Sequence, residues 1–166
     1  PGTSVFVSAG TVHAIGGGIL LAEIQQNSNI TYRVHDWNRV DACGKPRQLH
    51  LDKAMEAIEF GPVEPEPAQR QVSGDNNHRI LSACPYFVTE VVEITRSWEW
   101  LKGREHFHIL VALDAGMTVL AGDSYVRLAR GGAVLVPGQV GEYRVEGSGQ
   151  ILLYTVLSPS HPLQPR

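Results

Sequence analysis

Short apolar runs of strand length dominate the chain, and glycine, proline and polar residues separate them. Several of these runs alternate apolar and polar positions, which is typical of a strand with one buried face. The pattern therefore predicts an all-β chain. The runs are residues 4–8, 18–25, 30–37, 86–94, 106–113, 118–122, 133–137 and 150–157.

One segment has helical rather than strand-like spacing. In QLHLDKAMEAIEF, residues 48–60, the apolar residues Leu51, Met55 and Ile58 are three or four positions apart, so they would share one face of a helix. The next residues, 61–77, are rich in proline, glutamate and polar side chains, which disfavours a central strand or a helix interior. The pattern predicts a helix followed by a connector.

We expect two β-rich halves, residues 1–60 including the helix and residues 78–166, joined by the linker 61–77. The segments that begin at Gly2 and at Gly131 superpose without a gap, and each reads as a glycine turn, an apolar strand and a second turn. This repeat favours a duplicated module, and chance similarity between two β-hairpins is the alternative. Strand-rich halves with such turns suggest a double-sheet jelly roll.

Composition narrows the classes of partner. The chain has 166 residues, 43% of them hydrophobic and 19% charged, which is enough for one domain or two small ones with a buried core. A net charge of −3 offers no basic stripe for nucleic acid. No apolar run approaches a membrane span, so no membrane partner is expected. Cys43 and Cys84 have no CxxC spacing, which predicts idle or packed thiols in a reducing cytoplasm.

The residues up to His13 resemble a metal motif of the cupins. The pattern of that motif is G-D-x-x-x-x-P-x-G-x-x-H, and Gly2, Gly10 and His13 match it. Thr3 stands in place of the acid and Ser8 in place of the proline. In the cupins this histidine points from a strand into the barrel, so the resemblance implies that His13 is a metal ligand. Taken alone, a histidine after a turn reads as a packed or exposed residue.

A longer stretch is similar to the type I mannose-6-phosphate isomerases of the cupin superfamily. In bacterial members a GTxHAxGxG turn is followed by E-x-Q-Q-x-S-D-x-T-Y-R-x-Y-D, a D/N-R pair and R-x-L-H-x-x-K-A. Here Asn29 replaces an acid and His35 a tyrosine, and residues 106–116 and 134–143 resemble the C-terminal cupin half of that family. The matching residues are Glu23, Gln25, Gln26, Ser28, Thr31, Tyr32, Arg33, Asp36, Arg39, Leu49, His50, Lys53 and Ala54.

The resemblance implies a cupin-type jelly-roll β-sandwich with two cupin-like halves, the first of them incomplete. It implies interconversion of mannose 6-phosphate and fructose 6-phosphate with one zinc ion, His13 being the last ligand and Arg33 an essential arginine. The other ligands of the family, a Gln/His pair (or the His alone) and a Glu, would lie upstream of Pro1. We therefore expect a fragment with little or no activity by itself. Because unpaired strand edges are a liability, its first strands should pair with another chain, swap between copies or fold back.

The implied reaction moves a proton between C1 and C2 of the sugar through a cis-enediol(ate). A Lewis acid can polarise the carbonyl, and a guanidinium at Arg33 can stabilise negative charge on that oxygen or on a phosphate. His35 would share a strand face with Arg33, so it is a substrate-contact candidate or an exposed strand histidine. Glu23 follows an apolar run and is either a substrate contact on the cavity wall or an outward surface acid.

Other polar residues of the same stretch have structural interpretations. Asp36 and Arg39 are expected to form a structural pair or a loop clamp. His50 and Lys53 lie at the start of the predicted helix, and packing or rim contacts explain them.

His106 and His108 have the H-x-H spacing of another cupin metal motif. That motif needs a glutamate four or five residues after the second histidine, and none is present there. A core strand is therefore the preferred interpretation of this segment. Glu142, which aligns with His13, stands alone, so the second half is expected to be free of metal and non-catalytic.

Two other functions stay open, because a fold does not determine a function. One is a different cupin enzyme or an epimerase-like sugar binder. The other is a non-catalytic module in which His13 and Arg33 are relics or carbohydrate contacts. The expected partner in the preferred interpretation is a small-molecule sugar phosphate.

Overall fold

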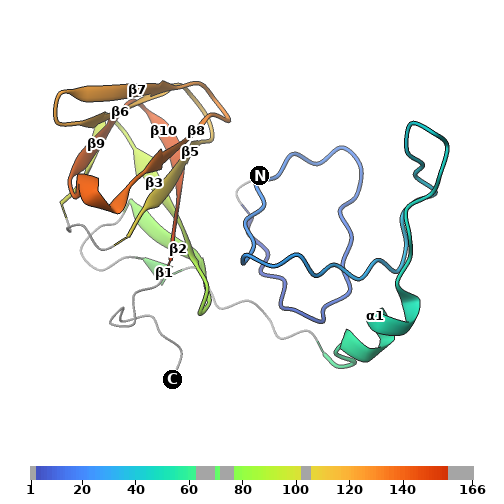
Figure 1. The fold of residues 1–166 in the computed structure, drawn as a ribbon. Helices are drawn as coiled ribbons and strands as arrows, with labels where there is room; N and C mark the ends of the chain where they lie inside the picture. The colour runs from blue at the N-terminus through green and yellow to red at the C-terminus, as the bar shows by residue number, and fades with distance from the viewer. Residues whose placement is uncertain (1–2, 63–69, 72–76, 102–105, 157–166) are drawn as a thin grey trace. The chain divides into compact units, whose positions relative to one another are not determined.

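The computed structural model describes residues 3–62, 70–71, 77–101 and 106–156 of the 166-residue chain. The chain forms two compact units, Val5–Pro65 and a second unit that contains Pro1–Ser4 and Glu66–Arg166. The first unit holds the helix α1, and the second holds the strands of two sheets (Figure 1).

The second unit consists of two antiparallel sheets, one with the strand order β1-β2-β3-β10-β5-β8 and one with the order β4-β9-β6-β7. This architecture confirms the predicted double-sheet β fold for this part of the chain. The short 3-10 helix η1 spans Gly138–Val140. The strands are β1 Arg70–Gln71, β2 His78–Ala83, β3 Val88–Ile94, β4 Ser97–Trp100, β5 His108–Ala112, β6 Met117–Ala121, β7 Ser124–Leu128, β8 Ala133–Val136, β9 Tyr143–Glu146 and β10 Gly149–Thr155.

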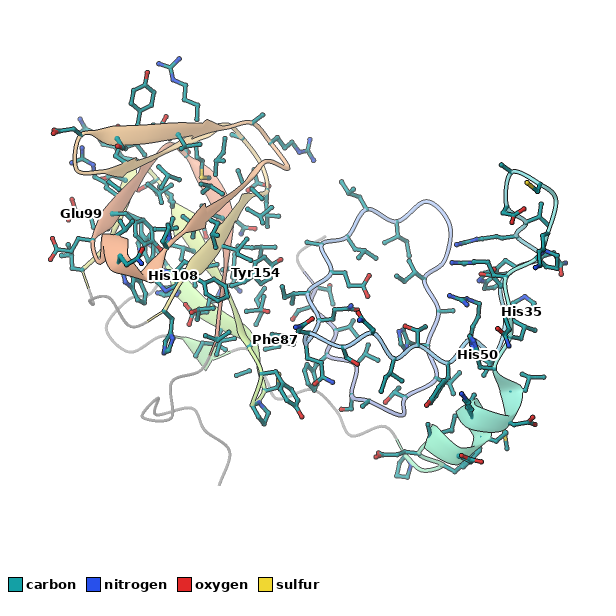
Figure 2. The ribbon with its side chains drawn as sticks, in the orientation of Figure 1. His35, His50, Phe87, Glu99, His108 and Tyr154 are labelled. Carbon is teal, nitrogen blue, oxygen red and sulfur yellow. The ribbon has the colours of Figure 1, made fainter. Side chains whose placement is uncertain are left out.

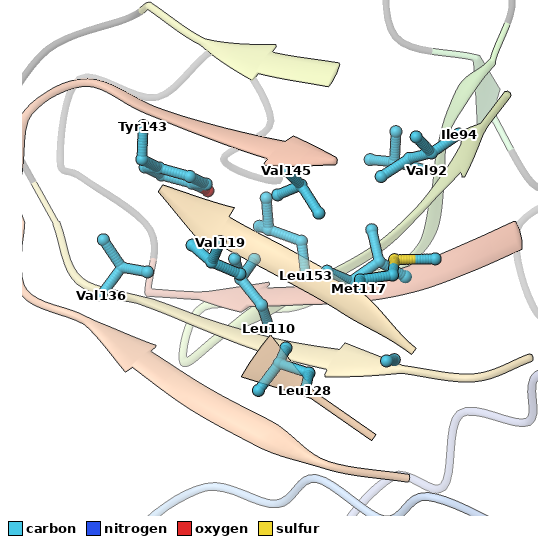
Figure 3. Packing of buried hydrophobic residues seen from close by; sticks show 12 residues of the cluster. Val92, Ile94, Leu110, Met117, Val119, Leu128, Val136, Tyr143, Val145 and Leu153 are labelled. Carbon is cyan, nitrogen blue, oxygen red and sulfur yellow. The ribbon is translucent and has the colours of Figure 1, made fainter. Parts of the chain in front are cut away.

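Alternating strand residues build the hydrophobic core between the two sheets. Leu153 of β10 is opposite Leu110 of β5, and both are fully buried, as is Val145 of β9 in the other sheet. Neighbours along a strand point to opposite faces, so a period of two sends every second side chain inward. Burial of each such aliphatic side chain stabilises the fold by about 1.5–3 kcal/mol. Figure 3 shows the cluster, which includes Val92, Ile94, Leu110, Met117, Val119, Leu128, Val136, Tyr143, Val145 and Leu153.

The predicted helix is confirmed as α1, Leu51–Ala57. Ala54 is the buried residue of this helix, whereas the side chains of Leu51 and Met55 are 55% and 60% exposed. Helical spacing shows which residues share a face, and only a packing partner buries that face. Neither α1 nor any other helix in the described residues has the length and apolar character needed to cross a membrane.

The runs 4–8, 18–25 and 30–37, predicted as strands, do not form strands. In the described part of the first unit, β pairing is limited to one isolated bridge between Val40 and Pro46. A strand needs a neighbour for its backbone N–H and C=O groups, and the described residues beside these runs supply none. Many apolar side chains of this unit are therefore exposed: Val5, Val7, Val12, Ile15, Ile19, Leu20, Leu21, Ile30, Tyr32, Val34, Trp37, Val40, Leu49, Leu51, Met55 and Phe60.

Truncation of Leu153 tests the core of the second unit. We expect Leu153→Ala to lower the free energy of unfolding by about 2–5 kcal/mol, because it removes a fully buried side chain and leaves a cavity. Urea unfolding followed by far-UV circular dichroism measures the change. Leu135→Ala is the matched control, since Leu135 lies in β8 of the same sheet and is 58% exposed. Equal losses in the two variants would contradict the described packing.

Candidate functional site

The candidate site lies in a loop of the first unit that folds back on itself between Arg33 and His50. The backbone N–H of His50 donates to the carbonyl oxygen of Arg33 at 2.8 Å. The bridge between Val40 and Pro46 joins the two arms farther along. At the tip, the Asp41 carboxylate accepts the backbone N–H groups of residues 43 and 45, both at 2.9 Å. These contacts place residues that are 17 positions apart in sequence side by side.

A strained turn spans residues 36–39 of this loop. The backbone N–H of Arg39 donates to the carbonyl oxygen of Asp36 at 2.9 Å, and the two central residues have positive φ, 52° at Trp37 and 55° at Asn38. Positive φ at both central positions is the signature of a type I′ turn. A bulky residue such as tryptophan is disfavoured there, at a cost of about 1–3 kcal/mol. Such strain often occurs at functional sites, and here it brings Arg39 back beside Asp36.

Asp36 is the centre of the polar contacts in this loop, although the residue is only 9% exposed. Nε of Arg47 donates to Oδ2 of Asp36 at 2.7 Å, and Nη2 of Arg47 donates to Oδ1. Nε of Arg33 lies 3.8 Å from the same Oδ1. The hydrogen bond from Arg47 lowers the pKa of Asp36 against the effect of burial, and the charges of Arg47, Arg33 and Arg39 lower it further. The same hydrogen bond raises the pKa of Arg47.

Arg33 is held at both its backbone and its side chain. Its backbone N–H donates to Nδ1 of His50 at 3.2 Å, and its Nη1 donates to the carbonyl oxygen of Gln48 at 3.2 Å. Because Nδ1 of His50 accepts, the proton of the neutral imidazole must lie on Nε2. Figure 2 shows His50 where the loop meets α1. The guanidinium of Arg33 therefore has a defined position, and its side chain is 23% exposed.

His13 follows a turn that contains Gly10, whose carbonyl oxygen accepts the N–H of Glu59 at 3.1 Å. Gly10 has a φ of +84°, and a Cβ there would lie 2.9 Å from the carbonyl oxygen of Ala57, so the position requires glycine. His13 is exposed, and its Nδ1 lies 2.9 Å from the carbonyl oxygen of Thr11. A carbonyl only accepts, so Nδ1 carries the proton and Nε2 keeps a free lone pair. Metal-binding histidines commonly have this arrangement.

The other predicted site residues, Glu23 and His35, are exposed. The imidazole of His35 meets the ring of Trp37 edge-on, with 5.1 Å between the centroids. Within the described residues, no hydrogen bond, ion pair or ring contact joins His13, Glu23 or His35 to Arg33. The structure thus groups Arg33 with Asp36, Arg47, Gln48 and His50 rather than with these candidates.

The predicted zinc site can be tested against the donor groups of the chain. His13 fits as one ligand, because Nε2 is free and exposed. Across residues 3–62, 70–71, 77–101 and 106–156, no group of three or more His, Cys, Asp or Glu residues could hold a metal ion. A catalytic zinc normally has three protein ligands, so the described residues do not form a complete zinc site.

The interior of the second unit contains polar groups that the sequence analysis did not identify. His78 of β2 and Glu90 of β3, which are 3% and 7% exposed, are in contact through Nε2 and Oε2. The ring of Trp98 meets His78 edge-on at 5.6 Å. A buried carboxylate is costly without a partner, and this pairing supplies one. The sequence SWEW could have indicated this buried environment. Trp98 and Trp100 alternate with polar residues, so both face the same side of a strand.

His108 is a core residue of β5, in agreement with the core strand predicted for this segment. It is 5% exposed, its Nδ1 is 2.9 Å from the hydroxyl of Tyr143, and the centroid of the Trp100 ring is 4.4 Å from that of the imidazole. Figure 2 labels His108. Burial lowers the pKa of His108 to about 4, and the charge of Glu90 opposes this shift. Burial also raises the pKa of Tyr143. Both groups are therefore neutral at pH 7.

Comparison with known proteins identifies relatives by sequence and by fold. No family model matches the chain. The mannose-6-phosphate isomerase ManA of Bacillus subtilis is 34% identical over 157 residues, which are 92% of this chain and 49% of that protein. The mannose-6-phosphate isomerase of Streptococcus mutans is 28% identical over 152 residues, 91% of this chain and 48% of that protein. The chain thus spans about half the length of the curated relatives it matches.

Solved structures extend the likeness. The crystal structure of the mannose 6-phosphate isomerase from Bacillus subtilis aligns with a TM-score of 0.66 and 25% identity, over 78% of this chain and 41% of that one. A phosphomannose isomerase from Salmonella typhimurium aligns with a TM-score of 0.52 over 68% of this chain and 30% of that one. With 13% identity, the second match indicates a shared fold alone.

The lowered pKa of His108 predicts how the stability of the second unit depends on pH. In the unfolded chain this histidine has a pKa near 6.5, and in the folded chain about 4, so between these values the unfolded state binds the additional proton. The free energy of unfolding should therefore decrease as the pH falls from about 6.5 to about 4. Urea unfolding at several pH values measures this slope.

The variant His108→Gln should have a smaller slope over the same range, because its side chain does not titrate. His13→Gln is the control, since His13 is exposed and belongs to the first unit. Identical slopes in the unchanged protein and in His108→Gln would show that His108 does not carry this pH dependence.

Proposed function

Because this chain is a relative of the mannose-6-phosphate isomerases, we propose that it belongs to an enzyme that interconverts mannose 6-phosphate and fructose 6-phosphate. The observation that carries the proposal is the 34% identity to ManA of Bacillus subtilis over 92% of this chain. The organised arginine cluster of the first unit supports it, because both substrates are phosphate monoesters and the reaction develops negative charge.

Arg33 is the proposed catalytic residue. The reaction moves a proton between C1 and C2 of the sugar, and negative charge develops on the carbonyl oxygen in the enediol(ate). A guanidinium that is already fixed in place stabilises this charge without reorganisation in the transition state. The contacts of Arg33 with Asp36, Gln48 and His50 support this role. Glu23 is proposed to contact the sugar hydroxyls together with His35.

His13 is proposed as one ligand of a zinc ion. A bound zinc would supply a Lewis acid for the sugar carbonyl. The described residues do not complete its ligand set, so the proposed role of this chain toward the metal is limited to the free Nε2 of His13.

The active site is proposed to need a second polypeptide segment, which would make up the other half of the length of the relatives. The exposed apolar runs of the first unit support this proposal. Residues 18–25 and 30–37 have strand-like sequences without a strand partner among the described residues, so added strands would satisfy their backbone groups and cover their side chains.

The second unit is proposed to be a structural, non-catalytic domain of a cytoplasmic enzyme. Its interior is filled by the hydrophobic cluster and by polar groups that bind one another. Cys43 and Cys84 are both free thiols, which agrees with a reducing compartment.

Metal content and turnover test the proposed function. We expect the chain by itself to bind no stoichiometric zinc and to turn over little mannose 6-phosphate, because the described residues supply no partner ligands for His13. Coexpression with a polypeptide that covers the other half of the ManA sequence should restore both properties. Elemental analysis and a coupled assay measure them. Zinc near one per chain with turnover by the chain alone would refute the need for a second segment, and turnover in neither case would refute the isomerase.

Substitution of Arg33 tests its role in the restored enzyme. Arg33→Lys should lower kcat/KM by about 10²–10³-fold, because a lysine keeps the charge but loses the planar set of donors. The control is Arg144→Lys, since Arg144 forms an exposed ion pair with Glu146 in the second unit. A kcat/KM for Arg33→Lys within twofold of the control would argue against a catalytic role of Arg33.

A further inference from the structure

The loop of residues 33–47 has a charge opposite to that of the whole chain. It carries four cationic side chains, Arg33, Arg39, Lys45 and Arg47, and two acidic ones, so its net charge is +2 against −3 for the chain. The carboxylate of Asp41 accepts backbone N–H groups of its own turn. This leaves Asp36 as the counterion for the arginines. The arginines thus exceed their counterion by two positive charges.

Asp36 holds these arginines close to one another. Arg47 and Arg33 both approach its Oδ1, and the turn at residues 36–39 returns the backbone of Arg39 to Asp36. Guanidinium groups repel one another, so an anion between them stabilises a cluster of this kind. Asp36 is one such anion, and the excess charge favours a second one.

Arg47 is the best placed of the three arginines for an external anion. Its Nε and one N–H of Nη2 bind the two oxygens of Asp36, which fixes the plane of the guanidinium. Its side chain is still 48% exposed, and Nη1 and the second N–H of Nη2 have no partner among the described residues, so they can donate toward solvent. Arg33 is more enclosed, at 23%. A fixed planar pair of donors matches the oxygens of a phosphate group.

We propose that Arg47 and Arg39 bind the phosphate group of the sugar phosphate. The carboxylate of Asp36 positions Arg47 and holds Arg33 for the reacting end, and the turn at residues 36–39 positions the backbone of Arg39. This assignment rests on the proposed function, because it takes a sugar phosphate as the ligand. A phosphate monoester carries a charge of about −1.5 to −2 at pH 7, which matches the excess of two positive charges. One carboxylate would then set the distance between the phosphate contact and the catalytic guanidinium.

The test is isothermal titration calorimetry of the whole chain at low salt with three ligands: mannose 6-phosphate, mannose and inorganic phosphate. Arg47→Lys keeps the partner charge of Asp36 but removes the planar donors. Arg39→Gln removes an exposed side chain, so it provides a test that does not depend on the Asp36 ion pair. The matched control is Arg127→Gln, an exposed arginine of β7 in the second unit. Circular dichroism checks that each variant keeps its fold.

We expect both site variants to weaken binding of mannose 6-phosphate and of inorganic phosphate by roughly 10- to 100-fold, the effect of losing a hydrogen bond to a charged group. The control should bind as the unchanged chain does, and any affinity for mannose should not change. Unchanged affinity of both site variants for mannose 6-phosphate would overturn the assignment and leave the proposed isomerase standing. Absence of binding of either phosphate ligand to the unchanged chain would also overturn it.

A third result separates this assignment from the proposed function. If the chain binds inorganic phosphate through Arg47 and Arg39 but shows no preference for mannose 6-phosphate over inorganic phosphate, the phosphate site stands. The isomerase proposal then loses support, because the site does not distinguish its substrate.

Discussion

The ion pair between Asp36 and Arg47 is the contact on which the candidate site depends. It joins residues that are 11 positions apart and closes the loop that holds Arg33. The carboxylate is almost completely enclosed, so its charge requires a partner in the folded chain. Arg47 provides that partner through two hydrogen bonds, and the remaining charge on Oδ1 reaches Arg33. One acidic residue thus organises two guanidinium groups with different exposures.

The strained turn after Asp36 is part of the same loop. Positive φ is unfavourable for Trp37, whereas asparagine tolerates it at Asn38, and the turn persists because the contacts around it hold both ends. The bridge from Val40 to Pro46 and the backbone hydrogen bond between Arg33 and His50 fix the two arms. The result is a loop that presents several positive charges in a defined order within an acidic chain.

The two units show how far apolar patterning depends on a partner surface. In the second unit, strands such as β3 and β10 find neighbours in register, and their inward residues fill the space between two sheets. In the first unit, residues of the same character stay exposed, Leu20 at 93% and Val5 at 76%. A neighbouring strand supplies both the backbone hydrogen bonds and the surface that buries side chains, so a segment without such a neighbour lacks both. Buried polar residues also need a partner. His78 and Glu90 are both buried, and each binds the other.

The sequence by itself determined the parts of the protein that follow from local spacing. Period-two runs identified β3, β5, β6, β8 and β10, helical spacing identified α1, and a motif singled out Arg33 and His13. Tertiary structure decided the rest. It added the strands β1, β2, β4, β7 and β9, left the apolar face of α1 exposed, and joined Asp36 to Arg47. Spacing along a chain determines which side chains share a face. Burial, strand pairing and ion pairing depend on segments that are far away in sequence.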